Sequence, residues 1–229
     1  MIPHAIRESA SFRVLYCFML DNRLSRRALF SVLGRRLRRE LVVENVEHRP
    51  RGVQELKHAY TMALLHGFDR AMTRGHVSKR VAERLLENFP QDFGVLFVHF
   101  PLVDGMRHVH GWMSWQQLSV AFRADEALGL ILAELDARGL RDETLIIVTS
   151  DHGGHDTTHG YSYPEDMTIP WVVSGPGVQP KALTMPVNTM DTAATAAFML
   201  GLPIPPEWDG VPVYEAFGLP VERQSAPCE

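Results

Sequence analysis

The chain has 229 residues, of which 45% are hydrophobic and 22% charged, as is typical of one globular domain. A formal net charge of −4 provides no basic field that would recruit a nucleic-acid polymer. The two cysteines lie near opposite ends and exclude a disulfide framework, and no apolar run reaches the roughly 20 residues of a membrane-spanning helix. We therefore expect a cytoplasmic protein as the chain stands, or a periplasmic or secreted one if its true N-terminus is missing.

The first 89 residues are expected to be mostly helical. Within them, an arginine-rich stretch at 23–40 can place its leucines on one side of a helix and its arginines on the others. Three interpretations are open: a helix with a solvated charged face, a helix that binds a membrane surface or an acidic partner, or a segment whose natural neighbours are absent.

From about residue 90 onward the pattern is typical of an α/β fold. We expect strands at 94–100, 144–150 and 169–178, and helices at 114–137 and near 191–200. The first two strands are continuous apolar runs, as expected for strands buried on both faces. Ser114 is a suitable N-cap for the long helix and Gly139 a suitable stop. The apolar side of this helix is expected to comprise Leu118, Phe122, Leu128, Ile131, Leu132 and Leu135.

Strands that alternate with helices, without hairpin signals, predict a mainly parallel central sheet flanked by helices. In such sheets, ligands gather at the carboxyl ends of the strands. Two groups of acidic and histidine residues fall at that position, each in a loop directly after a predicted strand. The first group contains Asp104 and His108, and the second contains Asp151, His152 and His159. Carboxylates and imidazoles at two converging loops indicate a metal site for Zn²⁺ or Mn²⁺.

Four stretches of the chain carry a family resemblance: DGMRHVHGWMS, SDHGGHDTTHG, EDMTIPWVVSGPGV and MDTAATAAFMLGLPIPPEWDG. Together they resemble the alkaline phosphatase superfamily, in its nucleotide pyrophosphatase/phosphodiesterase and sulfatase-like branch, over about residues 90–217. The resemblance implies an alkaline-phosphatase-like domain that spans 1–229 as a partial domain, with 90–217 as its metal-site core. It also implies a hydrolase of small phosphoesters, either phosphodiesters and pyrophosphates or phosphomonoesters, with sulfate esters as the close variant.

The resemblance further implies two divalent metal ions, Zn²⁺ in the first place and Mn²⁺ as the alternative. Asp104, His108 and His159 would hold one ion, and Asp151 and His152 would contribute to the other. His110, His155 and Arg107 are candidates for groups that lie behind the ligands or face the substrate. The family usually has glycine where this chain has Arg107, so this position is either strained, if it needs a positive φ, or able to contact an anionic substrate.

The nucleophile of the family is not identified in this chain. Asp21 is the only formal candidate for the N-terminal metal-binding aspartate, and the expected Ser/Thr-rich loop is missing. We therefore expect a fold that lacks its N-terminal strand or strands, and a second ion that is bound more weakly than the first. The alternatives are a metal-binding remnant without turnover and, less favoured, an isomerase or mutase. The oligomeric state is open.

Overall fold

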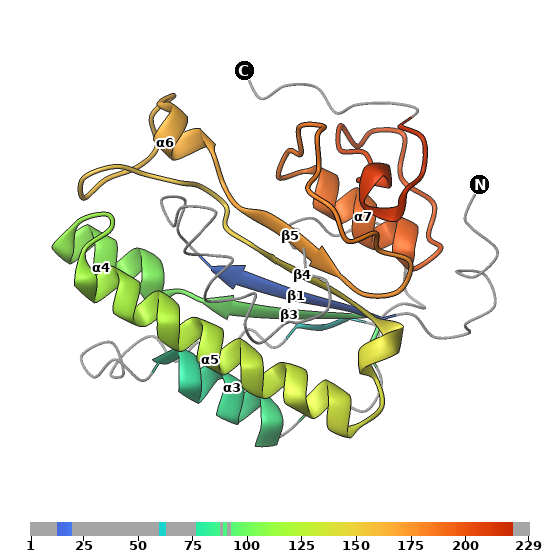
Figure 1. Ribbon diagram of the computed structural model, residues 1–229, viewed down its shortest axis with the longest axis horizontal. Coiled ribbons are helices and arrows are strands. Elements are labelled where there is room, and N and C mark those ends of the chain that lie inside the picture. The colour runs from blue at the N-terminus through green and yellow to red at the C-terminus, as the bar shows by residue number, and fades with distance from the viewer. Residues whose placement is uncertain (1–12, 20–59, 63–76, 88, 91–92, 222–229) are drawn as a thin grey trace.

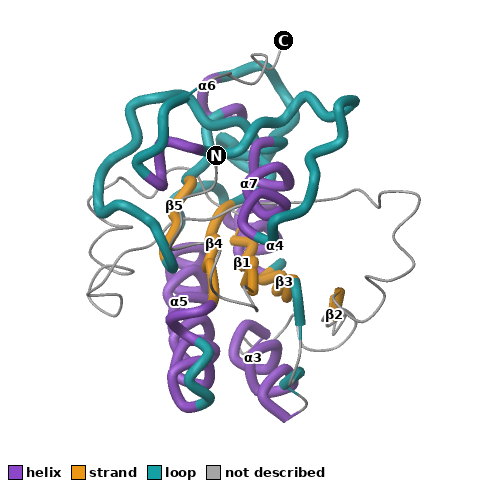
Figure 2. The backbone as a smooth tube through the Cα atoms, turned by 90° about the vertical axis from the view of Figure 1, so that its right-hand side faces the viewer, coloured by secondary structure: helices purple, strands orange, loops and turns teal. Residues whose placement is uncertain are grey.

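The computed structural model describes residues 13–19, 60–62, 77–87, 89–90 and 93–221. Its strands are β1 (Arg13–Met19), β2 (Tyr60–Met62), β3 (Val95–Phe100), β4 (Thr144–Thr149) and β5 (Trp171–Ser174). Its helices are α3 (Val77–Glu87), α4 (Leu102–His110), α5 (Trp115–Ala137), α6 (Pro164–Met167) and α7 (Asp191–Met199), with short 3₁₀ helices at Arg141–Glu143 and Tyr214–Phe217. Figure 1 shows the sheet between α3 and α5 on one side and α7 on the other, and Figure 2 shows the same layers from the side.

The described strands form one sheet in the order β2-β3-β1-β4-β5. β1 pairs in parallel with both β3 and β4, and β2 pairs in parallel with β3. This confirms the expected α/β fold with a mainly parallel sheet. β5 is antiparallel to β4, because the chain between these two strands stays at the edge where β4 ends and returns from there.

The described residues before position 89 differ from the mostly helical segment that we expected. β1 lies in the middle of the sheet and β2 at its edge, and only α3 is helical there. The apolar run of β1 fits one side of a helix as well as it fits a strand. Pairing with two neighbouring strands, which lie far along the chain, makes this segment a strand. The arginine-rich stretch 23–40 and Asp21 lie outside the described residues.

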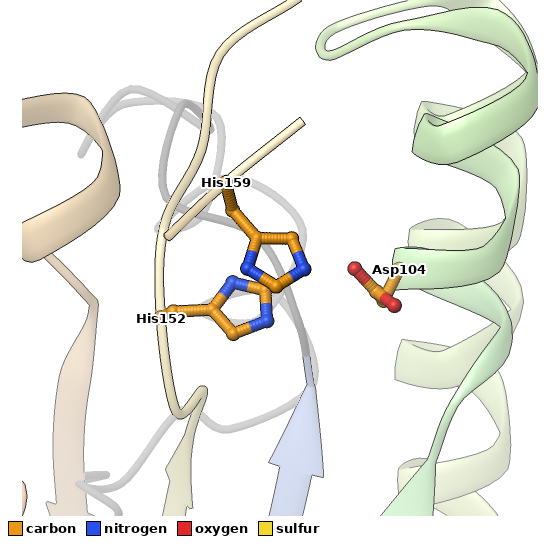
Figure 3. A group of neighbouring side chains, drawn as sticks. All are labelled: Asp104, His152 and His159. Carbon is orange, nitrogen blue, oxygen red and sulfur yellow. The ribbon is translucent and has the colours of Figure 1, made fainter. Parts of the chain in front are cut away.

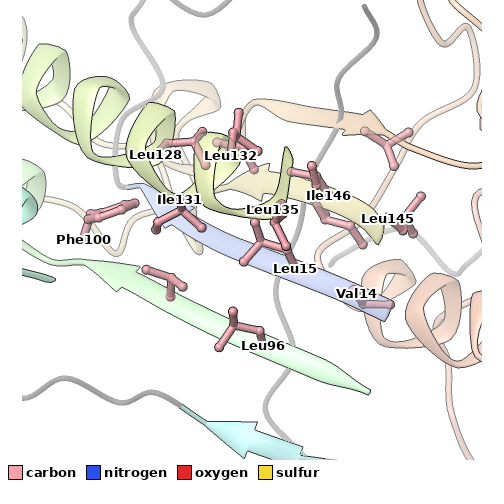
Figure 4. Close-up of a cluster of buried hydrophobic side chains, with 14 of the residues drawn as sticks. Val14, Leu15, Leu96, Phe100, Leu128, Ile131, Leu132, Leu135, Leu145 and Ile146 are labelled. Atoms are coloured by element: carbon pink, nitrogen blue, oxygen red, sulfur yellow. The ribbon is translucent and has the colours of Figure 1, made fainter. Parts of the chain in front are cut away.

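The core on one face of the sheet forms between α5 and the central strands. Leu128, Ile131 and Leu135 of α5 are buried and pack in one cluster with Leu15 of β1 and Leu96 of β3 (Figure 4). Full burial of each such side chain stabilises the folded state by about 1.5–3 kcal/mol relative to leaving it exposed to water. The buried stripe continues through Val120, Ala121, Ala124 and Ala127. Phe122, expected on this side, is half exposed.

Both ends of α5 follow the sequence prediction. The Ser114 hydroxyl accepts a hydrogen bond from the Gln117 amide at 3.3 Å, as an N-cap does. After the helix, Gly139 has a φ of 67°, a left-handed conformation that glycine adopts without steric cost. Within the described part of the chain, no helix has both the length and the apolar composition needed to cross a membrane.

Candidate metal centre

The candidate metal centre lies where three parallel strands end at one edge of the sheet. The strand register pairs Met19 of β1 with Phe100 of β3, and Phe18 of β1 with Thr149 of β4. The segments that follow β3 and β4 therefore leave the sheet on either side of β1. This edge is where α/β proteins collect their ligands.

Three side chains from these two segments converge. Asp104, His152 and His159 each offer one ligand atom, and these atoms lie within 4.8 Å of one another. Figure 3 shows the Asp104 carboxylate on α4 facing the two imidazole rings, with the end of β1 in blue below them. All three residues are partly exposed, so an ion can reach them. One carboxylate and two imidazoles form a donor set that fits a divalent ion such as Zn²⁺ or Mn²⁺.

Asp104 and His108 lie on a helix, whereas the sequence analysis placed them in a loop. α4 has nine residues and begins directly after β3, with Pro101 before its first residue. A spacing of four residues places both side chains on one helix face, and His108 Nε2 lies 3.6 Å from Asp104 Oδ2. The helix therefore fixes the relative positions of these two groups more rigidly than a loop would.

Arg107 is buried within the site. It lies inside α4 and is not among the residues with positive φ, so no backbone strain arises. Its side chain is fully buried, with 0% of its surface exposed, and therefore faces no substrate. The guanidinium donates from Nε to Asp104 Oδ1 at 2.7 Å and from Nη1 to the Thr157 carbonyl at 3.2 Å. It also lies over the Trp112 ring, 5.3 Å from the ring centroid.

The two histidines of the second group lie close to each other and to His108. The rings of His152 and His159 stack with centroids 3.7 Å apart, and the ring of His108 lies 5.3 Å from that of His159. His152 Nδ1 donates to the Gly153 carbonyl at 2.7 Å, which leaves its Nε2 as the acceptor. Burial lowers the pKa of His159, and the neighbouring His152 and Arg107 lower it further. A neutral imidazole keeps the lone pair that binds a metal.

Asp151 and His110 lie at the margin of the site. Asp151 follows β4, and its side chain is 42% exposed, with its Oδ1 3.6 Å from His152 Nε2. Partial burial of the carboxyl raises its pKa, and the neighbouring His152 opposes this effect. His110 is the last residue of α4 and is exposed. Neither residue belongs to the cluster of three, whose members are Asp104, His152 and His159.

Trp112 joins the two segments that carry the site. Its amide donates to the Asp156 carbonyl at 2.6 Å, and its indole Nε1 donates to the Thr158 carbonyl at 3.1 Å. The ring lies so close to Gly154 that a Cβ there would overlap it. The structure buries the Trp112 ring. Its position fixes the end of α4 against the loop that contains His159.

His155 is oriented by a buried carboxylate. Its Nδ1 donates to Asp166 Oδ1 at 2.7 Å, and the other oxygen of Asp166 accepts the Tyr161 amide at 2.8 Å. The imidazole packs edge-on against Tyr161 and Tyr163, which stack on each other and are each about half exposed. Sequence reasoning missed Asp166, because it lies 11 residues after its histidine and carries no local signal.

Comparison with known proteins places this geometry in a family. Residues 35–169, more than half of the chain, match the family described as Type I phosphodiesterase / nucleotide pyrophosphatase. An ulvan-active sulfatase of Formosa agariphila is 31% identical over 101 residues, which are 40% of this chain and 19% of the sulfatase. GPI ethanolamine phosphate transferase 2 of Aspergillus fumigatus is 28% identical over 154 residues, which are 60% of this chain and 19% of the transferase.

Solved structures show the same fold. A 2-O GAG sulfatase, BT1596, superposes with a TM-score of 0.63 at 12% sequence identity, over 93% of this chain and 75% of the sulfatase. At this identity the likeness concerns the fold alone. The chain spans about a fifth of the length of the two curated relatives described above.

Proposed function

The chain belongs to the type I phosphodiesterase / nucleotide pyrophosphatase family of the alkaline phosphatase superfamily, and on this premise we propose that it is a metal-dependent hydrolase of phosphate esters. The observation that carries the proposal is the convergence of Asp104, His152 and His159 at the carboxyl edge of the sheet. The substrate class is phosphodiester, pyrophosphate or phosphomonoester, with sulfate ester as the close variant. Its members are small molecules.

A divalent ion at these three residues would polarise the ester and neutralise charge on the transferred group. The chain itself contributes the positions of the ligands. Asp104 is fixed on α4, and the stacked rings of His152 and His159 present their nitrogens toward it. His155 donates from Nδ1 to Asp166, which would leave its Nε2 for a role behind the ligands or toward the substrate. Two imidazole donors favour Zn²⁺ or Mn²⁺ over Ca²⁺, which prefers oxygen ligands.

The family resemblance implies two ions. It assigns Asp104, His108 and His159 to one ion and Asp151 and His152 to the other, whereas the cluster in the structure groups His152 with Asp104 and His159. Two protein ligands hold an ion less tightly than three, so the second ion is expected to bind more weakly. The nucleophile is not assigned to any described residue.

A second candidate function is a metal-binding protein without turnover. It is favoured by the same feature, since a metal cluster without an assigned nucleophile can bind an ion and yet catalyse no covalent step. The two candidates differ in one measurement, the hydrolysis of an activated ester. Binding of metal alone does not separate them.

The first prediction tests hydrolysis. The chain loaded with Zn²⁺ or Mn²⁺ is expected to hydrolyse bis(p-nitrophenyl) phosphate faster than p-nitrophenyl sulfate. Asp104→Asn and His159→Ala are each expected to lower kcat/KM by at least about 100-fold, because each removes a ligand of the ion. The control is Asp136→Asn, which alters an exposed aspartate outside the cluster.

Nitrophenolate release measures the rates, and circular dichroism confirms that each variant folds. Hydrolysis that persists in both Asp104→Asn and His159→Ala would exclude this site as the catalytic centre. No hydrolysis of any ester by a chain that binds metal would favour the second candidate function.

A further inference from the structure

One guanidinium contacts both of the groups on α4 that the family resemblance assigns to the first ion. Arg107 Nε donates to Asp104 Oδ1 at 2.7 Å, and Nη2 lies 2.5 Å from the same oxygen. Nη2 also lies 2.5 Å from His108 Nε2. The arginine therefore bridges the carboxylate and the imidazole with a single charged group.

The contacts of His108 fix the direction of this bridge. The guanidinium lies near both ring nitrogens of His108, with Nη2 2.5 Å from Nε2 and Nη1 3.0 Å from Nδ1. The Thr157 carbonyl lies 3.1 Å from Nδ1 as well, and in the tautomer that donates to this carbonyl the lone pair is on Nε2, the nitrogen that the guanidinium meets at the shorter distance. A neutral imidazole in this tautomer offers one metal-binding lone pair, and the arginine occupies it.

The arginine is built into the fold at this point. Its side chain is fully buried, its Nη1 donates to the Thr157 carbonyl, and its plane lies over the buried ring of Trp112. Guanidinium stays protonated at any pH in which proteins fold, so it cannot give up its charge to admit a second cation. Moving it away would leave a buried charge without its carboxylate partner, which is costly.

An ion between Asp104 and His108 would need metal–ligand distances of about 2.0–2.2 Å to the atoms that Arg107 already contacts. The ion and the guanidinium would then be close neighbours of like charge, which repel strongly in a partly buried site. His152 and His159 belong to the other segment, and together with Asp104 they form the cluster of ligand atoms within 4.8 Å. Both contacts of Arg107 with Asp104 use Oδ1, so Oδ2 is available for an ion at the cluster.

We propose that Arg107 is a built-in cation that takes the place of an ion between Asp104 and His108. The chain then holds one divalent ion tightly, at Asp104, His152 and His159, and His108 is a ligand of the arginine and not of the metal. This inference refines the metal centre of the proposed function and rests on it in that respect.

The test is Zn²⁺ titration calorimetry on the full chain, which reports stoichiometry and affinity without any ester substrate. The wild-type chain is expected to bind one equivalent tightly. Arg107→Gln removes the charge and is expected to strengthen a second equivalent by about tenfold or more. Arg107→Lys keeps the charge and is expected to resemble the wild type. Arg80→Gln, which makes the same change at an exposed residue of α3, is the matched control.

Two equally tight equivalents in the wild type would overturn the proposal, and so would an Arg107→Gln variant that titrates like Arg80→Gln. A second measurement needs no variant and covers the case in which Arg107→Gln does not fold. In ¹⁵N NMR spectra of the wild type, one equivalent of Zn²⁺ is expected to shift the ring nitrogens of His152 and His159 and leave His108 Nε2 unshifted. A shift of His108 Nε2 equal to theirs would overturn the proposal.

These readouts separate the failure of the inference from that of the proposed function. A chain that binds one ion as expected and hydrolyses no ester would contradict only the hydrolase. A chain that hydrolyses esters and binds two equally tight ions would contradict only the role of Arg107. No binding of Zn²⁺ by the wild type or by Arg107→Gln would overturn both.

Discussion

Both carboxylate oxygens of Asp166 accept hydrogen bonds from the loop that follows β4. One accepts from the His155 ring and the other from the Tyr161 amide, while the residue is buried. The Gly153 amide also donates to the Asp166 carbonyl at 2.7 Å, so that α6 is fastened to the loop that follows β4. The carboxylate therefore sets both the proton position on His155 and the course of the chain around it.

Asp166→Asn is predicted to destabilise the fold by about 1–3 kcal/mol, because an amide can satisfy only one of the two donors and leaves the other buried without an acceptor. Urea unfolding measures this loss, with the exposed Asp142→Asn as control. ¹⁵N NMR is expected to show that His155 no longer carries its proton on Nδ1 alone. An unchanged tautomer would contradict the orienting role.

The same contact predicts a pH dependence at acid pH. Burial alone would raise the pKa of Asp166, but the hydrogen bonds from His155 and Tyr161 outweigh it and lower the pKa below its ordinary value of 3.8. A lowered pKa in the folded state contributes stability that is complete above the ordinary value and is lost as the pH falls below it. The difference in unfolding free energy between wild type and Asp166→Asn should therefore narrow below about pH 4.

At the scale of elements, the site depends on two loops that interlock around Trp112. Met113 and Asp156 both have positive φ, at 61° and 43°, although neither is glycine. These strained residues flank the contact between the Trp112 amide and the Asp156 carbonyl. The packing of the indole ring against Gly154 is what keeps the two loops in this arrangement.

Gly154→Ala is predicted to destabilise the protein by about 1–3 kcal/mol and to weaken metal binding, because the added methyl would overlap the Trp112 ring. The φ of Gly154 is not in the positive region, so space alone is at issue. The cost should shrink in a Trp112→Leu background, where the ring is gone. An equal cost in both backgrounds, measured by urea unfolding, would show that the ring is not the obstacle.

How much of the fold the sequence could predict depends on whether the determining contacts are local. The α5 helix, its N-cap Ser114 and the buried strand β4 were predicted because their signals lie within the segments themselves. α4 was not predicted, because nine residues that include a glycine give a weak periodic pattern. β1 was read as part of a mostly helical segment, and its strand character comes from pairing with β3 and β4, which lie far along the chain.

The candidate site also has features that local sequence predicts and contacts that it does not. The residue types of Asp104, His152 and His159, and their places after two strands, could be predicted from the sequence, and the structure brings them together. The contacts of Arg107 could not be predicted, because its partner Thr157 comes from the other loop, 50 residues away. A family resemblance assigns metal ligands by their position in the sequence, whereas a contact with a neighbouring side chain can change the role of the residue at that position.

At the scale of the whole molecule, the metal centre joins segments that the sheet places side by side. Asp104 follows β3, His152 and His159 follow β4, and β1 lies between these strands. Within the described residues, the end of α4 and the 152–159 loop are otherwise joined chiefly through Trp112 and Arg107. An ion at the three ligands would therefore be a cross-link between two halves of the rim.

This arrangement predicts that metal stabilises the whole fold. With Zn²⁺ at about 100 times its dissociation constant, the gain is about 2.7 kcal/mol, since the unfolded chain does not hold the three ligands together. For a chain of this size, that gain raises Tm by about 5–10 °C. Hydrogen exchange should slow in 102–110 and 151–159 together, because the ion ties both segments. EDTA should reverse both effects, and Asp104→Asn should show neither. Protection confined to the 151–159 loop would mean that the ion does not reach α4, and the bridging centre would then be wrong.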